Sequence, residues 1–117
     1  MSDIAYQSFI IPQGATWTQS LVWKTGAPPT GVNLNGFTGR MQLRENAGAP
    51  NVAVELTSGN GRITVGNNGS ITLSLSAAET AAVPARRYVY DLEMVSSGGL
   101  VTRLLEGTVT ISPGVTR

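Results

Sequence analysis

Apolar and polar positions alternate through the last third of the chain. Tyr88, Tyr90, Leu92 and Met94 share one parity, which is the period of a strand with one buried face. A turn-forming Ser-Ser-Gly-Gly stretch follows at 96–99, and a second apolar-rich run returns over 100–111. The pattern predicts a long β-hairpin whose aromatic and aliphatic face forms one wall of the core.

Shorter apolar-rich runs earlier in the chain predict further strands, separated by turn residues such as Gly, Pro and Asn. These predicted strands cover residues 9–11, 17–23, 37–44, 52–56, 63–65 and 71–75. The Pro- and Gly-rich stretch from Lys24 to Asn35 is long for a hairpin connection, so we expect it to cross between two sheets. A functional loop is the alternative for this stretch.

Ser76 and Glu79 have the Ser-x-x-Glu spacing of a helix capping box, and Pro84 would end the helix. The spacing predicts one short helical turn near 76–83. With about eight strands and this turn, the fold class is all-β. Because adjacent hairpins dominate, we expect an antiparallel β-sandwich, Ig-like or jelly-roll-like, with a partly closed barrel as the alternative. The 117 residues suit a single domain, 1–117.

Parity also predicts which side chains are buried. We expect the core to contain at least one of Trp17 and Trp23, together with Met41, Leu43, Leu73, Tyr90, Leu92, Val109 and Ile111. Strict alternation from Leu105 and Val109 would point Arg103 into this core, where an unpaired guanidinium is too costly to bury. We therefore predict a β-bulge or rim position between Val101 and Leu105 that releases Arg103 toward Glu93 or Glu106.

Composition narrows the function classes. The chain has no His, so it lacks the commonest general base and the commonest metal ligand. It has no Cys either, so thiol chemistry is excluded. Eight basic and seven acidic residues give a net charge of +1, which does not indicate nucleic-acid or membrane binding. Charged residues are 13% of the chain, about half the ~25% typical of soluble domains. Such a surface favours assembly with other proteins, although an ordinary Ser/Thr-rich β-protein surface has the same composition.

Two groups of residues could carry chemistry. Asp91, Glu93 and Glu106 could bind Ca²⁺ or serve glycoside hydrolysis, but paired charges on a flat strand, matched with Arg103 or Arg86, explain them better. Trp17 and Trp23 could form a sugar-stacking platform, although core packing is the favoured interpretation. We therefore expect no catalytic, cofactor-binding or metal-binding residues, no cofactor and no enzymatic activity.

Several segments together resemble a known class of proteins. They are an N-terminal apolar strand followed by Gln13-Gly14 and two tryptophans, then Leu34 to Arg44 with its strongest part from Gly36, then Leu73 to Ala77, Tyr88 to Glu93, and Leu104 to Val109. The chain resembles the small β-sandwich virion accessory proteins of tailed bacteriophages and is similar to the N-terminal domain of upper baseplate proteins. The resemblance implies a structural role, attachment by surface contact and no catalysis. Because the chain ends with this domain, we expect a stand-alone accessory piece such as a head decoration (cement) protein or a neck, tail or baseplate component.

The resemblance also implies the partners, which would be other virion proteins (major capsid, neck or tail subunits) and further copies of the chain in a homo-oligomer. The expected location is the virion, after synthesis in the cytoplasm of the bacterial host. We expect neither nucleic acid nor a membrane as a partner. The predicted contact residues flank the core strands at both ends of the chain: Ser2, Asp3, Tyr6, Pro113, Val115 and Arg117. A carbohydrate- or receptor-binding β-sandwich module is the alternative function.

Overall fold

The structure, a computed structural model, describes residues 5–115, which form eleven strands and one short helix. The wide sheet has six strands, in the order β1 (Ala5–Tyr6), β11 (Val101–Ser112), β10 (Arg87–Val95), β6 (Thr38–Arg44) and β7 (Val54–Thr57), with β2 (Phe9–Pro12) also paired to β11. The narrow sheet has three, in the order β3 (Trp17–Val22), β9 (Ser70–Leu75) and β8 (Ile63–Val65). A small ribbon pairs β4 (Lys24–Thr25) with β5 (Thr30–Gly31), and helix α1 spans Ala77–Ala81.

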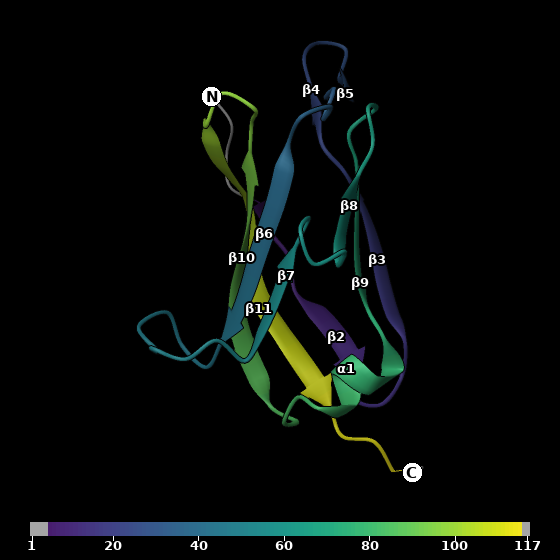
Figure 1. The fold of residues 1–117 in the computed structure, drawn as a ribbon, viewed down its shortest axis with the longest axis vertical. Coiled ribbons are helices and arrows are strands. Elements are labelled where there is room, and N and C mark those ends of the chain that lie inside the picture. Colours follow the sequence, from purple (N-terminus) through teal and green to yellow (C-terminus); the bar gives the residue numbers. More distant parts are fainter. Residues whose placement is uncertain (1–4, 116–117) are drawn as a thin grey trace.

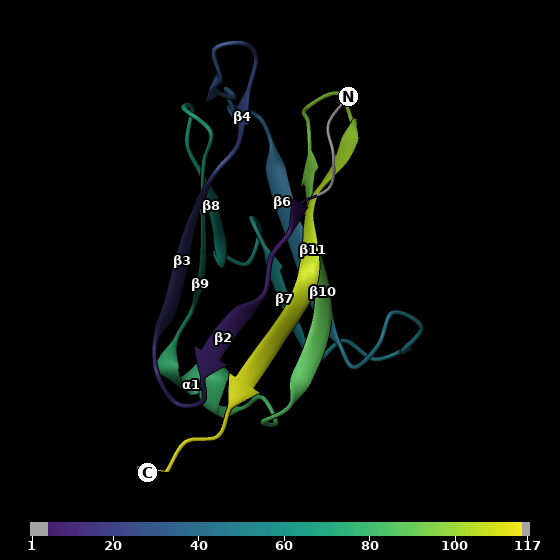
Figure 2. The same cartoon turned by 180° about the vertical axis from the view of Figure 1, so that it is seen from behind.

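The narrow sheet faces the wide sheet (Figures 1 and 2), and one hydrophobic cluster packs between them. Both sheets supply it through alternate residues, so each strand buries one face and leaves the other outside. The core prediction is confirmed, because the structure buries all of its members: Trp17, Met41, Leu43, Leu73, Tyr90, Leu92, Val109 and Ile111. Trp23 is only partly buried and packs against the edge of this cluster.

The predicted hairpin is the antiparallel pair β10 and β11, and its register shifts once. Leu92 pairs with Leu105, whereas Glu93 pairs with Arg103, which leaves Leu104 as the extra residue of a β-bulge. The shift turns Arg103 to the surface, where its guanidinium lies 3.5 Å from Asp91 and 3.9 Å from Glu106. The predicted irregularity and the contact with Glu106 are confirmed.

The start of the chain meets its last long strand in a parallel arrangement, which the sequence patterns did not predict. Both β1 and β2 run parallel to β11, and the segment between them approaches Gly107 closely. A Cβ atom at Gly107 would lie 2.2 Å from the Gln7 carbonyl oxygen, so a larger residue would displace this segment. The Gln7 N–H donates to the Glu106 carbonyl at 3.0 Å, and the Tyr90 hydroxyl donates to the Gln7 carbonyl at 2.7 Å.

The short helix is held by the predicted capping box. The Ser76 hydroxyl accepts a hydrogen bond from the Glu79 N–H at 3.1 Å, and the Ser76 N–H donates to the Glu79 carboxylate at 2.7 Å. Thr80 anchors the helix to the loop after β2, because its buried hydroxyl accepts from the Gly14 N–H and donates to the Ala15 carbonyl. The helix Ala77–Ala81 lies within the predicted range of 76–83.

The stretch from Lys24 to Asn35 crosses from β3 in the narrow sheet to β6 in the wide sheet, as predicted. It contains the β4–β5 ribbon and inserts Leu34 into the core. The all-β class and the mainly antiparallel pairing are confirmed, but the expected count of about eight strands is too low. The additional strands β1, β4 and β5 have two residues each, too short for an alternation pattern to reveal.

A substitution at Leu92 tests which face of β10 is buried. It is 0% exposed at the centre of β10, so Leu92→Ala should lower the free energy of unfolding by roughly 2–5 kcal/mol through lost burial and a cavity. Thr64→Ala, at an exposed position on β8, is the control and should change stability by less than about 0.5 kcal/mol. Equal losses for the two variants in urea unfolding would contradict the assignment.

The buried Tyr90 hydroxyl predicts that the folded protein loses stability at alkaline pH. Burial raises the pKa of its hydroxyl well above the ordinary value of 10.0, and nearby Tyr6 adds to the shift. Because folding raises this pKa, the stability due to the neutral hydroxyl is complete below 10.0 and is lost as the pH rises beyond that value. Wild type should therefore lose more stability than Tyr90→Phe between about pH 8 and pH 11 in denaturant titrations. Parallel losses in the two proteins would show that Tyr90 ionises freely.

Candidate protein interface

The outer face of the wide sheet brings the three predicted carboxylates together and pairs each with a guanidinium. Asp91 lies directly opposite Glu106 on β11, and Arg103 reaches both. Glu93 bonds to Arg40 of β6 at 2.7 Å. Pairing with Arg103 is therefore confirmed, whereas Arg86 bonds to Glu45 at 3.0 Å and to none of these three. An open hollow of about 500 Å³ lies beside Asp91 and Arg103.

This arrangement offers little to acid–base chemistry or metal binding. Side chains of Asp91 and Glu106 are 42% and 47% exposed, and both lie beside the Arg103 guanidinium. A proton-donating carboxyl would instead need an apolar, desolvated setting. Within residues 5–115, no three Asp, Glu, His or Cys side chains gather closely enough to hold a metal ion.

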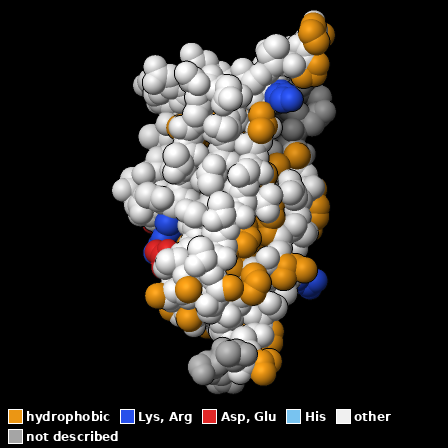
Figure 3. All heavy atoms as spheres, turned by 90° about the vertical axis from the view of Figure 1, so that its right-hand side faces the viewer, with side chains coloured by type: hydrophobic (Ala, Val, Ile, Leu, Met, Phe, Trp, Pro, Cys, Tyr) orange, Lys and Arg blue, Asp and Glu red, His pale blue; other side chains and the backbone are white. Residues whose placement is uncertain are grey.

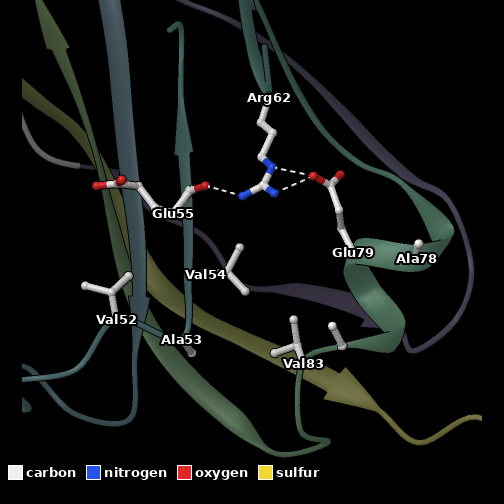
Figure 4. A pocket seen from close by; sticks show the side chains of 9 residues that line it. Val52, Ala53, Val54, Glu55, Arg62, Ala78, Glu79 and Val83 are labelled. Atoms are coloured by element: carbon white, nitrogen blue, oxygen red, sulfur yellow. Dashed lines mark hydrogen bonds and ion pairs between the residues drawn. The ribbon is translucent and has the colours of Figure 1, made fainter. Parts of the chain in front are cut away.

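A second hollow, of about 530 Å³, opens between β7 and helix α1 (Figure 4). Val52, Val54 and Val83 form its floor, and Arg62 closes its upper rim. The Arg62 guanidinium donates to the Glu79 carboxylate at 2.7 Å and to the Glu55 carbonyl oxygen at 2.7 Å. Arg62 thus connects the helix beside the narrow sheet to the edge strand of the wide sheet, and its charge is already matched by Glu79.

The outer face of the narrow sheet carries no charged side chain on its three strands. Figure 3, which views the molecule from the side where this sheet lies, shows mainly uncharged atoms there. Outward positions are small hydroxyl residues and one valine: Thr18, Ser20, Val22, Thr64, Ser70, Thr72 and Ser74. Covering such a face requires no ion to lose its hydration, so it can contact another protein at low desolvation cost.

Among the predicted terminal contact residues that the structure describes, Tyr6 lies well apart from Pro113. Tyr6 is 70% exposed on β1 and Val115 is 90% exposed near the end of the described chain. Tyr6 lies opposite Glu106, and Pro113 directly follows β11, so the two groups are separated by roughly 20 Å along that strand. The predicted contacts at Ser2, Asp3 and Arg117 lie outside the described residues.

Two further apolar residues are highly exposed, and the sequence patterns did not predict their exposure. Ile10 on β2 is 69% exposed, and Leu100 at the tip of the β10–β11 hairpin is 72% exposed. Alternation contains the signal for Ile10, because Phe9 and Ile11 on either side are buried and must share the opposite face. Leu100 follows a turn, where alternation gives no face.

The tryptophans pack edge-on against other rings. Trp17 is buried with its ring centroid 5.8 Å from that of Phe9, and half-buried Trp23 lies 5.9 Å from Phe37. Both contacts are T-shaped, a favourable aromatic geometry. With Trp17 buried and Trp23 packed on Phe37, the two rings do not make the flat, exposed row that sugar stacking needs.

Comparison with known proteins does not assign the chain to a family: no family model matches it, and no curated protein shows significant sequence similarity. In the part of the chain from Ala5 to Val115, no helix is long and apolar enough to cross a membrane.

The hydrogen bonds that the Glu79 carboxylate accepts from Ser76 and Arg62 should weaken in acid. Hydrogen bonds from the Ser76 N–H and, next, from the Arg62 guanidinium hold the pKa of Glu79 below its ordinary value of 4.5. Since folding lowers this pKa, the stabilisation is present above 4.5 and is lost as the pH falls below it. Wild type should exceed Glu79→Gln in urea midpoint at neutral pH, and the two should converge in acid. Gln is also accepted in capping boxes, so the comparison isolates the charge. A gap that persists at low pH would contradict this cause.

Proposed function

We propose that this chain is a non-enzymatic structural component of a tailed-phage virion, attached by surface contacts as an accessory of the head, neck, tail or baseplate. The observation that carries the proposal is the uncharged outer face of the narrow sheet, which includes the exposed Val22. A sheet face without charged side chains suits contact with neighbouring subunits, because charged residues are depleted at the centres of protein interfaces. The quoted sequence segments, which resemble virion accessory proteins, supply the kind of particle.

The finer fold that we propose is an Ig-like β-sandwich, in preference to a jelly roll. The order β2–β11–β10–β6–β7 opposite β3–β9–β8 corresponds to strands A′-G-F-C-C′ opposite B-E-D of that fold. Parallel pairing of β2 with β11 fits the A′ position. Tyr88, near the start of β10, also donates its hydroxyl to the Pro84 carbonyl at 2.8 Å, the geometry of the tyrosine corner that marks strand F.

The Ig-like fold hosts many functions, so the surface rather than the fold supports the role. The charged face of the wide sheet is internally paired and the outer face of the narrow sheet is uncharged, which suits protein partners better than nucleic acid or an anionic membrane. Partners would be capsid, neck or tail subunits and further copies of this chain. The packed tryptophans disfavour the carbohydrate-binding alternative.

Purified particles test the proposal directly. Quantitative mass spectrometry of particles from the phage that encodes this chain should find it in a fixed, symmetry-related number of copies per particle. Complete absence from the particle would overturn the proposal.

Deleting residues 115–117 tests the predicted C-terminal contact. The cut leaves the β11 ladder intact, along with the hydrogen bonds that link Gln13 to Ser112 and Gly114. The shortened chain should keep its melting temperature but compete poorly with wild type for incorporation into particles. A matched control is Asn51→Ala, at an exposed position in the loop before β7 that belongs to neither sheet face, and it should incorporate normally. Normal incorporation of the deletion variant would remove the C-terminal end from the contact surface.

A further inference from the structure

The narrow sheet has an open edge along β3. Among the described residues, β3 pairs with β9 alone, so one side of its backbone lacks a strand partner. In the Ig constant-type order, a fourth strand occupies the place beside the equivalent strand. Here the described N-terminal strands, β1 and β2, pair with β11 in the wide sheet, so none of the strands that the structure describes fills that place.

The backbone alternation shows which groups point to this open edge. The Trp23 N–H donates to the Gly69 carbonyl at 2.8 Å, so odd-numbered residues of β3 make the bonds to β9. The N–H and C=O groups of Thr18, Ser20 and Val22 therefore point away from β9, toward the open edge. Of these groups, the Ser20 carbonyl accepts a long, exposed contact from the Gln19 side-chain amide at 3.4 Å, which another strand would replace. Three consecutive donor and acceptor pairs can thus serve an added strand.

Unlike the other edges, β3 has none of the features that normally prevent strand addition. The edge strand β7 carries Glu55, β8 has three residues and follows Arg62, and β2 ends in Pro12. In contrast, β3 has six residues, and residues 16–23 contain neither a charge nor a proline.

A groove of about 940 Å³ runs beside this edge, between the two sheets, and both apolar and polar residues line it, Lys24 among them. Leu21 and Trp23 form one wall, and Leu104 and Ala5 belong to the other. Leu21, Trp23 and Leu104 are only partly buried, so the core is incompletely covered here. A strand added to β3 would send every second side chain into this groove.

We propose that the open edge of β3 pairs with β3 of a second copy of this chain, antiparallel and about a two-fold axis. In such a pair each strand meets its own sequence, so any charge near the axis would face a like charge. The uncharged sequence of β3 avoids this repulsion. In the proposed register, Ser20 pairs with Ser20 of the other copy, and Thr18 pairs with Val22. All three residues whose backbone groups point to the open edge then form hydrogen-bonded pairs.

This register also keeps the core-side residues of both copies on the core side of the joined sheet. Leu21 of each copy lies opposite Gln19 of the other, on the core side, and both enter the groove. The two narrow sheets become one continuous six-stranded sheet with an uncharged outer face. The inference rests on the homo-oligomeric part of the proposed function and does not require the virion assignment.

The test uses the purified full-length chain and three variants at position 20. Light scattering should give the mass of two chains for wild type and for Ser20→Ala, which keeps the backbone N–H. Ser20→Pro removes the backbone N–H at the centre of the open edge but breaks no hydrogen bond to β9. This variant should give the mass of one chain and an unchanged circular dichroism spectrum. Ser20→Lys, which places like charges at the axis, should also be monomeric and covers the case in which proline disturbs folding.

Cross-linking tests the register. The chain has no cysteine, and Cα atoms of a hydrogen-bonded antiparallel pair are about 5.5 Å apart, within disulfide range. Ser20→Cys should therefore form a disulfide-linked dimer under mild oxidation, whereas Thr64→Cys on the opposite edge should not. A monomeric wild type, a dimer that persists in both Ser20→Pro and Ser20→Lys, or cross-linking only through Thr64→Cys would each overturn the proposal. A monomer that still enters particles would overturn it while leaving the virion function standing.

Discussion

The close approach of the Gln7 backbone to Gly107 is the contact on which the layered arrangement depends. Only a residue without a side chain lets the N-terminal segment lie against β11, where the Tyr90 hydroxyl and the Glu106 carbonyl then hold Gln7. That contact assigns β1 and β2 to the wide sheet. Among the described residues the narrow sheet is consequently left with three strands, and its open edge along β3 and the groove beside that edge follow from the same cause.

The two outer faces have opposite characters because different interactions support them. On the wide sheet, cross-strand ion pairs such as Arg40 with Glu93 satisfy the charges within the molecule, although pairs this exposed contribute little to stability. On the narrow sheet, hydroxyl side chains bond equally well to water or to another protein. One face therefore keeps the protein hydrated, while the other is left available for contact at small energetic cost.

Alternation predicted the buried faces well because a half-buried strand imposes its period on the sequence residue by residue. The bulge was predictable for an energetic reason, since no regular register could keep Arg103 in solvent. Parallel docking of β2 left no such signal, because its partner lies a hundred residues away and Gly107 reads as an ordinary turn-forming residue. The same limit applies to the predicted contact residues: the sequence did not show how far Tyr6 lies from Pro113 along β11, because that separation depends on the docking of the N-terminal strands.

The pairing of Ser8 with Thr108 across a hundred residues also sets the order in which the molecule can be completed on the ribosome. At roughly 5–20 residues per second, β2 emerges on the order of 5–20 s before β11 exists to receive it. During that interval Phe9 and Ile11 have no strand to cover them, and the narrow sheet lacks its opposite wall. The fold can therefore close only after synthesis of β11, which makes the nascent chain, rather than the finished protein, the stage most exposed to misassociation and to chaperones.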